Sequence, residues 1–264
     1  MIPHSTQQQL HRIWQRCAEF PAANADSAMQ YFMTEMLDIL DADSAVWHCA
    51  ARNKNFIAIP AVDLFDEWYS ADVIRVTPKP PALNPLEVFK LYVKLKEKHG
   101  PDTVASGVIQ AAGSSRGALR SDYLNDEEWA DSWLLKEFYE PLNRIDLMYS
   151  VFTVDEDCES YILYHRDEGK SFFSESERNI GLTASMGIAH LHRQLMTLRG
   201  AKLPCSRLLS PKEKKVLNLL LSGKREKEIA LELDISVSTS GKHLSSIYRK
   251  LEVSGQFELL QSLA

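Results

Sequence analysis

A two-residue gap between two predicted helices constrains this chain more than any other feature of its sequence. Residues 226–233 have the apolar spacing of one helical face. Asp234 and Ile235 follow, and Ser236 then has the residue type that caps the start of the next helix. So short a connection turns one helix sharply against the other. The pattern predicts a helix-turn-helix arrangement, which proteins use to read DNA.

Start and stop signals before this pair predict another helix. Ser210, Pro211 and Glu213 occupy the N-cap, N1 and N3 positions of a capping box, so a helix should begin at Pro211. Gly223 is the residue type that ends it.

The helix after Ser236 has two chemically different sides. Leu244, Ile247 and Leu251 mark the side that packs inward, and the other side carries hydroxyls and cations. From Ile235 to Leu251 there is no acidic residue. Such a surface fits the major groove and the phosphates of double-stranded DNA. We predict DNA contacts for Ser238, Thr239, Lys242, His243, Ser245, Arg249 and Lys250, with Ser246 on the same side.

The net charge of −6 conceals an asymmetry along the 264 residues. Residues 1–204 hold 20 Lys and Arg against 29 Asp and Glu, whereas residues 205–264 hold 10 against 7. The excess of positive charge lies in the segment with the helix-turn-helix pattern, as expected for a polyanion partner.

Several short motifs in this segment resemble the LuxR-type helix-turn-helix family, also called the NarL/FixJ type. The resemblance covers about 208–262 and rests on the following residues: Leu209-Ser210-Pro211-x-Glu213, Lys227-Glu228-Ile229-Ala230, Ile235-Ser236, Thr239, His243 and Ile247-Tyr248-x-Lys250-Leu251. It implies a four-helix domain, dimeric on DNA, whose third helix reads bases and whose last short helix, about 256–263, packs or dimerises. Arg225, Ser240-Gly241 and Glu252 depart from the family pattern, and Gly241 replaces a lysine that commonly contacts DNA.

The first two hundred residues contain both helices and short strands, but these do not follow one another as a regular βα repeat. Cap residues, apolar spacing and prolines predict helices at about 8–20 and 27–40, strands at 45–49 and 56–59, a helix from Pro85, a helix capped by Asn125, a hairpin of 149–154 with 160–165, and one long helix from 174 to 198. The fold class expected is α+β, with an antiparallel-sheet domain at 1–200 and an all-α domain at 205–264.

Several types of input domain are disfavoured by missing motifs. The chain has neither a phosphate-binding P-loop pattern nor the acidic pair of a phosphorelay receiver. Trp68 and Tyr69 are adjacent, whereas the acyl-homoserine-lactone receptors place Trp and Tyr four apart, which weakens that assignment. What remains resembles a GAF or PAS-like sensor over about 25–198, which implies a small-molecule pocket between a sheet and its covering helices.

Aromatic residues on the acidic-capped helix are the candidates for lining that pocket. They are Trp129, Trp133, Phe138 and Tyr139, with Trp47 and Tyr149 as further candidates. Aromatic residues at helical spacing also fill ordinary cores, so both interpretations stay open. The first domain can equally be a protein-binding module without a small-molecule ligand.

A seam of apolar residues along 180–198 suits packing against a partner helix. It can serve a homodimer, or it can cover the sheet of its own domain.

Catalysis and metal binding find little support. Gly113-Ser114-Ser115-Arg116-Gly117 matches the hydrolase pattern Gly-x-Ser-x-Gly, but no βα repeat surrounds it. His190 and His192 are two apart on a helix and point in different directions. The four cysteines form no Cys-x-x-Cys pair. We therefore expect no catalytic residue, metal or cofactor, and, without a spanning segment or signal peptide, a cytoplasmic location.

Overall fold

A six-stranded antiparallel sheet organises the first part of the chain. The computed structural model describes residues 2–21, 24–52, 62–65, 68–78, 84–155, 158–198, 209–221 and 223–263. The strands are β1 (Ser44–Ala51), β2 (Val62–Phe65), β3 (Trp68–Val76), β4 (Arg116–Leu119), β5 (Arg144–Asp155) and β6 (Cys158–Asp167). Their order is β2-β3-β1-β6-β5-β4, and every neighbouring pair is antiparallel.

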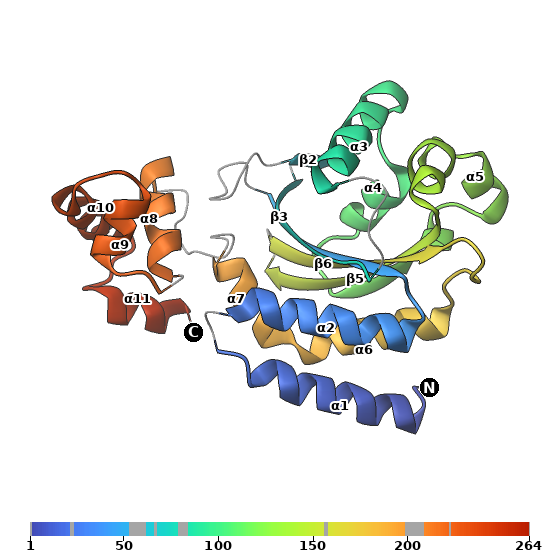
Figure 1. Cartoon of the computed structure of the whole chain (residues 1–264), viewed down its shortest axis with the longest axis horizontal. Coiled ribbons are helices and arrows are strands. Elements are labelled where there is room, and N and C mark those ends of the chain that lie inside the picture. Colours follow the sequence, from blue (N-terminus) through green and yellow to red (C-terminus); the bar gives the residue numbers. More distant parts are fainter. Residues whose placement is uncertain are drawn as a thin grey trace.

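Helices cover both faces of this sheet (Figure 1). The face that is lower in Figure 1, called the lower face, carries α2 (Ala25–Leu40), α6 (Glu175–Gly187) and α7 (Ala189–Leu198), with α1 (His4–Ala18) packed on α2. The opposite, upper face carries α3 (Pro85–His99), α4 (Thr103–Gln110), α5 (Asp126–Asp131) and a π-helical segment, Leu134–Tyr139. Short 3-10 turns lie before α5 at Arg120–Asp122 and after the π-helical segment at Glu140–Leu142.

Alternation along the central strands separates two apolar cores. In β1, Ala45, Trp47 and Cys49 belong to the core under α1, α2, α6 and α7. Val46 and His48 point the other way, because successive residues of a strand face opposite sides of the sheet. The two faces of one strand therefore serve two different environments.

A second unit, α8 to α11, consists of helices alone. Its helices are α8 (Pro211–Leu221), α9 (Glu226–Glu232), α10 (Val237–Lys250) and α11 (Gln256–Leu263). A small core that includes Val216, Ile229 and Ile247 holds them together. Gly223, Asp234 and Glu252 have positive φ and terminate α8, α9 and α10. The sheet and the all-helical unit confirm the α+β fold class expected from the sequence.

Local signals predicted most elements of the first unit correctly. The opening helices, the hairpin of β5 with β6 and the start of α3 at Pro85 are all present. Asn125 caps α5 by accepting hydrogen bonds from the amides of Glu127 and Glu128, each at 3.0 Å. The expected strand at 56–59 lies outside the described residues. The strand that pairs with β1 on that side is β3, which the sequence analysis did not predict.

The expected single helix over 174–198 is two helices. It breaks at Ile188, between α6 and α7. At the break, the indole of Trp14 donates a hydrogen bond to the carbonyl of Ala184 at 3.0 Å. Gly187 leaves the room for it, since a Cβ there would come within 2.0 Å of the Trp14 ring. The seam that includes Ile180, Ile188 and Leu195 is buried in the core of this chain, so it covers the sheet and offers no dimer surface.

None of the helices that the structure describes is long and apolar enough to cross a membrane.

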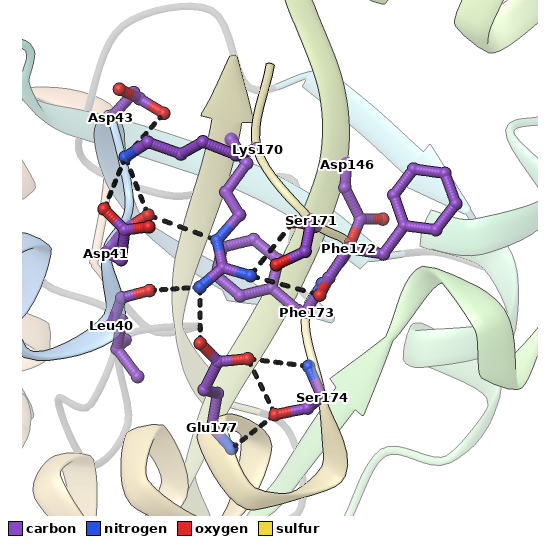
Figure 2. A network of polar contacts seen from close by, with 11 residues as sticks. Leu40, Asp41, Asp43, Asp146, Lys170, Ser171, Phe172, Phe173, Ser174 and Glu177 are labelled. Atoms are coloured by element: carbon purple, nitrogen blue, oxygen red, sulfur yellow. Dashed lines mark hydrogen bonds and ion pairs between the residues drawn. The ribbon is translucent and has the colours of Figure 1, made fainter. Parts of the chain in front are cut away.

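One buried guanidinium, that of Arg166, joins two helices of the lower face to the sheet, and Figure 2 labels the residues that it contacts. Arg166 of β6 is 2% exposed and donates to the carbonyls of Leu40 at 2.6 Å and Asp41 at 3.1 Å, where α2 ends. It also donates to two carbonyls before α6 and forms an ion pair with Glu177. Glu177 in turn closes the capping box of α6 with Ser174. The same charge therefore fixes the end of one helix and the start of another.

We expect Arg166→Met to lower the free energy of unfolding by about 3–5 kcal/mol. Removing the guanidinium would leave buried carbonyls without a hydrogen-bond donor and the Glu177 carboxylate without its counter-ion. Lys170→Met is the matched control. Lys170 is more exposed and pairs with Asp41 and Asp43 at the rim, so its loss should cost less than about 1 kcal/mol. Urea unfolding of the full chain measures both. Equal losses of unfolding free energy in the two variants would contradict the role of Arg166 in joining the helices to the sheet.

Candidate functional site

The recognition-type helix α10 begins at a side-chain cap and exposes one narrow face. Ser236 accepts a hydrogen bond from the amide of Thr239 at 3.0 Å and so satisfies a free donor of the first turn. Ser240, Leu244 and Ile247 are buried. The exposed positions on the opposite side are Ser238, Lys242, Ser245 and Arg249. Their spacing of four, three and four puts them on one helical face, which we call the α10 face.

The remaining residues predicted to contact DNA lie at the border of the α10 face. Thr239 and His243 are half-buried, and the Thr239 hydroxyl is 2.8 Å from that of Ser236. Lys250 is half-buried and forms an ion pair with Glu213 of α8 at 2.8 Å. Ser246 donates to the same carboxylate at 2.7 Å. Two polar groups of the predicted surface thus join α10 to α8.

Glu213 is the centre of that junction. Its carboxylate also accepts the amide of Ser210 at 2.6 Å, which closes the predicted capping box of α8. These donors lower the pKa of Glu213 to about 2, against the opposing effect of burial, which is the largest single influence. The orientation of α10 relative to α8 therefore depends on a carboxylate that stays charged at neutral pH.

Gly241 lies beside the α10 face and lets an acid approach it. A Cβ at this position would be 2.5 Å from Oε1 of Glu226, an exposed residue of α9. Gly241 also borders the shallow hollow lined by Ser238, Lys242 and Arg249. The absence of a side chain at Gly241 thus leaves room for the carboxylate of Glu226 beside the α10 face.

A cavity of about 180 Å³ lies in the first unit, between the upper face of the sheet and α3, α4 and the π-helical segment. Its apolar walls include Val46, Phe89, Val108, Ile109 and Leu163. Its polar lining comprises His48, Arg75, Tyr92, Asp102, Tyr139, Arg144, Tyr149, Tyr161 and His165. Apolar walls with a few converging polar groups are typical of small-molecule sites.

Three of the six aromatic residues predicted to bind a ligand line this cavity. They are Phe138, Tyr139 and Tyr149. Trp129 is not part of the cavity lining. It is buried against Tyr139, and its indole donates a hydrogen bond to the carbonyl of Ile145 at 2.9 Å. Trp133 stacks on His99, with the ring centroids 5.4 Å apart.

Trp47 lies on the opposite side of the sheet from the cavity. Its indole donates to Ser160 at 2.6 Å within the lower core. Its neighbour His48 faces the cavity instead, because alternation along β1 sends the two side chains to opposite faces.

The charged residues of the cavity were missed by the sequence analysis. Arg75 and Arg144 come from β3 and β5, and His165 comes from β6. An arginine inside the apolar run Val73-Ile74-Arg75-Val76 was the available signal for one of them. The imidazole of His165 lies 3.4 Å from Arg144 and 3.4 Å from the hydroxyl of Ser44. Burial, and then the nearby guanidiniums, lower the pKa of His165 well below its ordinary value, so this imidazole is neutral.

Ser115 and His192, which the sequence offered for catalysis and metal binding, form hydrogen bonds within the protein. The hydroxyl of Ser115 accepts the amide of Thr153 at 3.0 Å, and β4 follows it as an antiparallel strand where a hydrolase elbow has a helix. His192 is buried between Ser160, at 2.7 Å, and Ser185, at 3.0 Å. Cys17, Cys49 and Cys158 are buried, whereas Cys205 lies outside the described residues. Among the described residues, no group of three His, Cys, Asp or Glu side chains is placed to hold a metal ion.

The arrangement of α9 and α10, with a short turn and an outward polar face, is that of a helix-turn-helix unit. Residues 207–263 match the model of the bacterial regulatory proteins of the luxR family. The carboxyl-terminal unit is thus a LuxR-type helix-turn-helix domain.

Comparison with individual proteins gives matches of different extent. YhjB of Escherichia coli (strain K12), described as "Putative HTH-type transcriptional regulator", is 32% identical over 81 residues, which are 31% of this chain and 40% of that protein. A structure of SdiA in complex with octanoyl-rac-glycerol is similar over 100% of this chain and 95% of its own, at 14% identity and a TM-score of 0.47. A GAF domain from a phosphoenolpyruvate-protein phosphotransferase of Coxiella burnetii is similar over 74% of this chain and 95% of its own, at 12% identity and a TM-score of 0.39.

We expect Glu213→Gln to destabilise the helical unit in a pH-dependent manner. The folded pKa of Glu213 is about 2 and its ordinary value is 4.5, so its contribution is complete above pH 4.5 and is lost as the pH falls toward 2. The substitution should lower the free energy of unfolding by about 2 kcal/mol at neutral pH, as for other hydrogen bonds to charged groups. Urea unfolding of both proteins at a series of pH values should show the difference shrinking below pH 4.5. A difference that is constant with pH would contradict this role.

Proposed function

We propose that this chain is a transcription regulator that binds double-stranded DNA through the α10 face and responds to a small molecule in the cavity of its first unit. In this proposal residues 1–200 form the sensory domain, residues 205–264 form the DNA-binding domain, and the protein works in the cytoplasm. The α10 face is the observation that carries the proposal. Its exposed residues are two hydroxyls and two cations, Ser238, Ser245, Lys242 and Arg249, on a helix without an acid.

The chemistry of the α10 face fits a duplex. Two cations about two helical turns apart match phosphates on either side of a groove. Small hydroxyls let the helix approach the base edges. The ion pair of Lys250 with Glu213 joins α10 to α8 and so fixes the position of α10. We assign base and phosphate contacts to Ser238, Lys242, Ser245 and Arg249, and a supporting role to Thr239, His243 and Lys250.

We infer that the active form is a homodimer, as DNA readers of this type bind paired half-sites. Phe257 of α11 supports this, because this residue is 76% exposed while Leu259, two positions on, is buried. An exposed aromatic residue on a terminal helix is suited to an interface between two copies.

The sheet offers a route from the cavity to the DNA-binding domain. Tyr161 of β6 lines the cavity, and the adjacent Ser160 points to the other face and binds His192 of α7. A ligand that shifts β6 therefore acts on α7, the last element described before the helical domain. In this mechanism the ligand favours one placement of the two DNA-binding domains over another.

A ligand-independent regulator with a protein-binding first domain is the second candidate. The cavity and its polar lining favour the small-molecule proposal over this one. Catalysis has no part in either proposal.

We expect Lys242→Ala with Arg249→Ala to weaken binding to genomic DNA fragments and to flatten its dependence on salt. Each lost phosphate contact should reduce the slope of log K against log salt by about 1, because fewer counterions are released on binding. Fluorescence anisotropy over a range of salt concentrations measures this. Arg12→Ala with Lys90→Ala removes the same charge from exposed sites of the first unit and serves as the control. Equal slopes for the two double variants would reject the α10 face as the DNA contact.

A further inference from the structure

Two arginines that line the cavity form no ion pair with any residue that the structure describes. Arg75 and Arg144 come from β3 and β5 and line the same cavity. Among the residues that the structure describes, no carboxylate lies within the 4.0 Å of an ion pair from either guanidinium. The charge of Asp167 favours the charged form of Arg144. Burial lowers the pKa of both guanidiniums, and the charge of Arg144 lowers that of Arg75 further.

Other arginines of this unit show that the chain usually neutralises such charges. Arg116 pairs with Glu159 at 2.8 Å, and Arg120 pairs with Asp126 at 2.7 Å. Arg166 pairs with Glu177. Each of these guanidiniums has its counter-ion built into the protein, as buried charges generally require. Arg75 and Arg144 are half-buried, form no ion pair within the described part of the chain, and both line the cavity.

The remaining lining of the cavity supplies donors and little negative charge. The carboxylate of Asp102 is engaged by the amide of Ala105 at 2.9 Å and by the hydroxyl of Tyr92 at 3.2 Å. Tyr139 is 4% exposed and Tyr149 is 7% exposed, and their hydroxyls have no hydrogen-bond partner in the described part of the chain. Both tyrosines line the cavity, so their hydroxyls can donate hydrogen bonds to a molecule that enters it.

The neutral imidazoles do not compensate for the arginines. Burial, with the charge of Arg75, lowers the pKa of His48 to about 4, and His165 is neutral for the reasons given above. The guanidiniums therefore keep a net positive field among rings and aliphatic side chains. An oxyanion matches this field, because the planar fork of a guanidinium donates two parallel hydrogen bonds to a carboxylate or phosphate.

We propose that the cavity binds a small oxyanion with an apolar body of about the size of one ring, whose charged end lies between Arg75 and Arg144 and accepts hydrogen bonds from Tyr139 or Tyr149. This inference rests on the proposed sensory function and names the class of its ligand. Phe138, Val108 and Ile109 contact the apolar body. A volume of about 180 Å³ favours a compact acid over a long acyl chain.

The test compares isosteric probes on the full chain without DNA. Phenylacetate and phenyl phosphate carry an oxyanion, whereas phenylacetamide has nearly the same shape without charge. At constant ionic strength, at least one oxyanion probe should raise the melting temperature and bind in calorimetry, and phenylacetamide should do neither. The relative affinities of the two acids distinguish a carboxylate ligand from a phosphoryl one.

Arg75→Met and Arg144→Met should each weaken binding of the oxyanion probe roughly tenfold or more, the effect of losing a hydrogen bond to a charged group. Arg12→Met makes the same chemical change at an exposed site on α1 and should leave binding unchanged. Arg75→Lys and Arg144→Lys keep the charge but lose the fork, so they also report on the site if a methionine variant does not fold.

Several results would overturn the proposal. They are equal binding of phenylacetamide and phenylacetate, no binding of either oxyanion, and a loss of oxyanion affinity in Arg12→Met equal to that in Arg75→Met and Arg144→Met. DNA retention is measured separately, so the two proposals fail in different ways. A chain that binds DNA but no oxyanion rejects the ligand class alone, whereas a chain that binds the oxyanion but no DNA rejects the regulator.

Discussion

The alternation of side chains along β1 and β6 is the constraint on which the first unit depends. Because successive residues face opposite sides, each strand contributes to two separate environments. Trp47 and Ser160 belong to the sealed lower core, and their neighbours His48 and Tyr161 line the cavity. A one-residue slip in pairing would exchange the two sets. The register of the central strands thus determines whether a cavity exists at all.

Arg166 and His192 of the lower face have partners within the chain, whereas Arg75 and Arg144 of the upper face form no ion pair with the described residues. Arg166 is surrounded by carbonyls and Glu177, and His192 lies between two serines. Arg75, Arg144 and two tyrosine hydroxyls lack such partners within the described residues. This contrast within one domain separates groups that hold the fold from groups that are available to a ligand.

Sequence patterns predicted the local structure well and the long-range pairing less well. Caps such as Asn125 and Ser236 act within a few residues, so the sequence alone shows them. The α10 face followed from helical periodicity for the same reason. Strand β3 was missed, because its pairing with β1 depends on distant residues. The Arg75 and Arg144 pair was invisible for that reason too, as was the ion pair of Lys250 with Glu213 across two helices.

The central claim is that the α10 face enters the major groove of DNA. A structure of the full chain bound to a duplex selected from genomic fragments tests it most directly. We expect Lys242 and Arg249 to lie against phosphates and Ser238 and Ser245 to face base edges. A duplex held by another surface, with the α10 face turned to solvent, would contradict it.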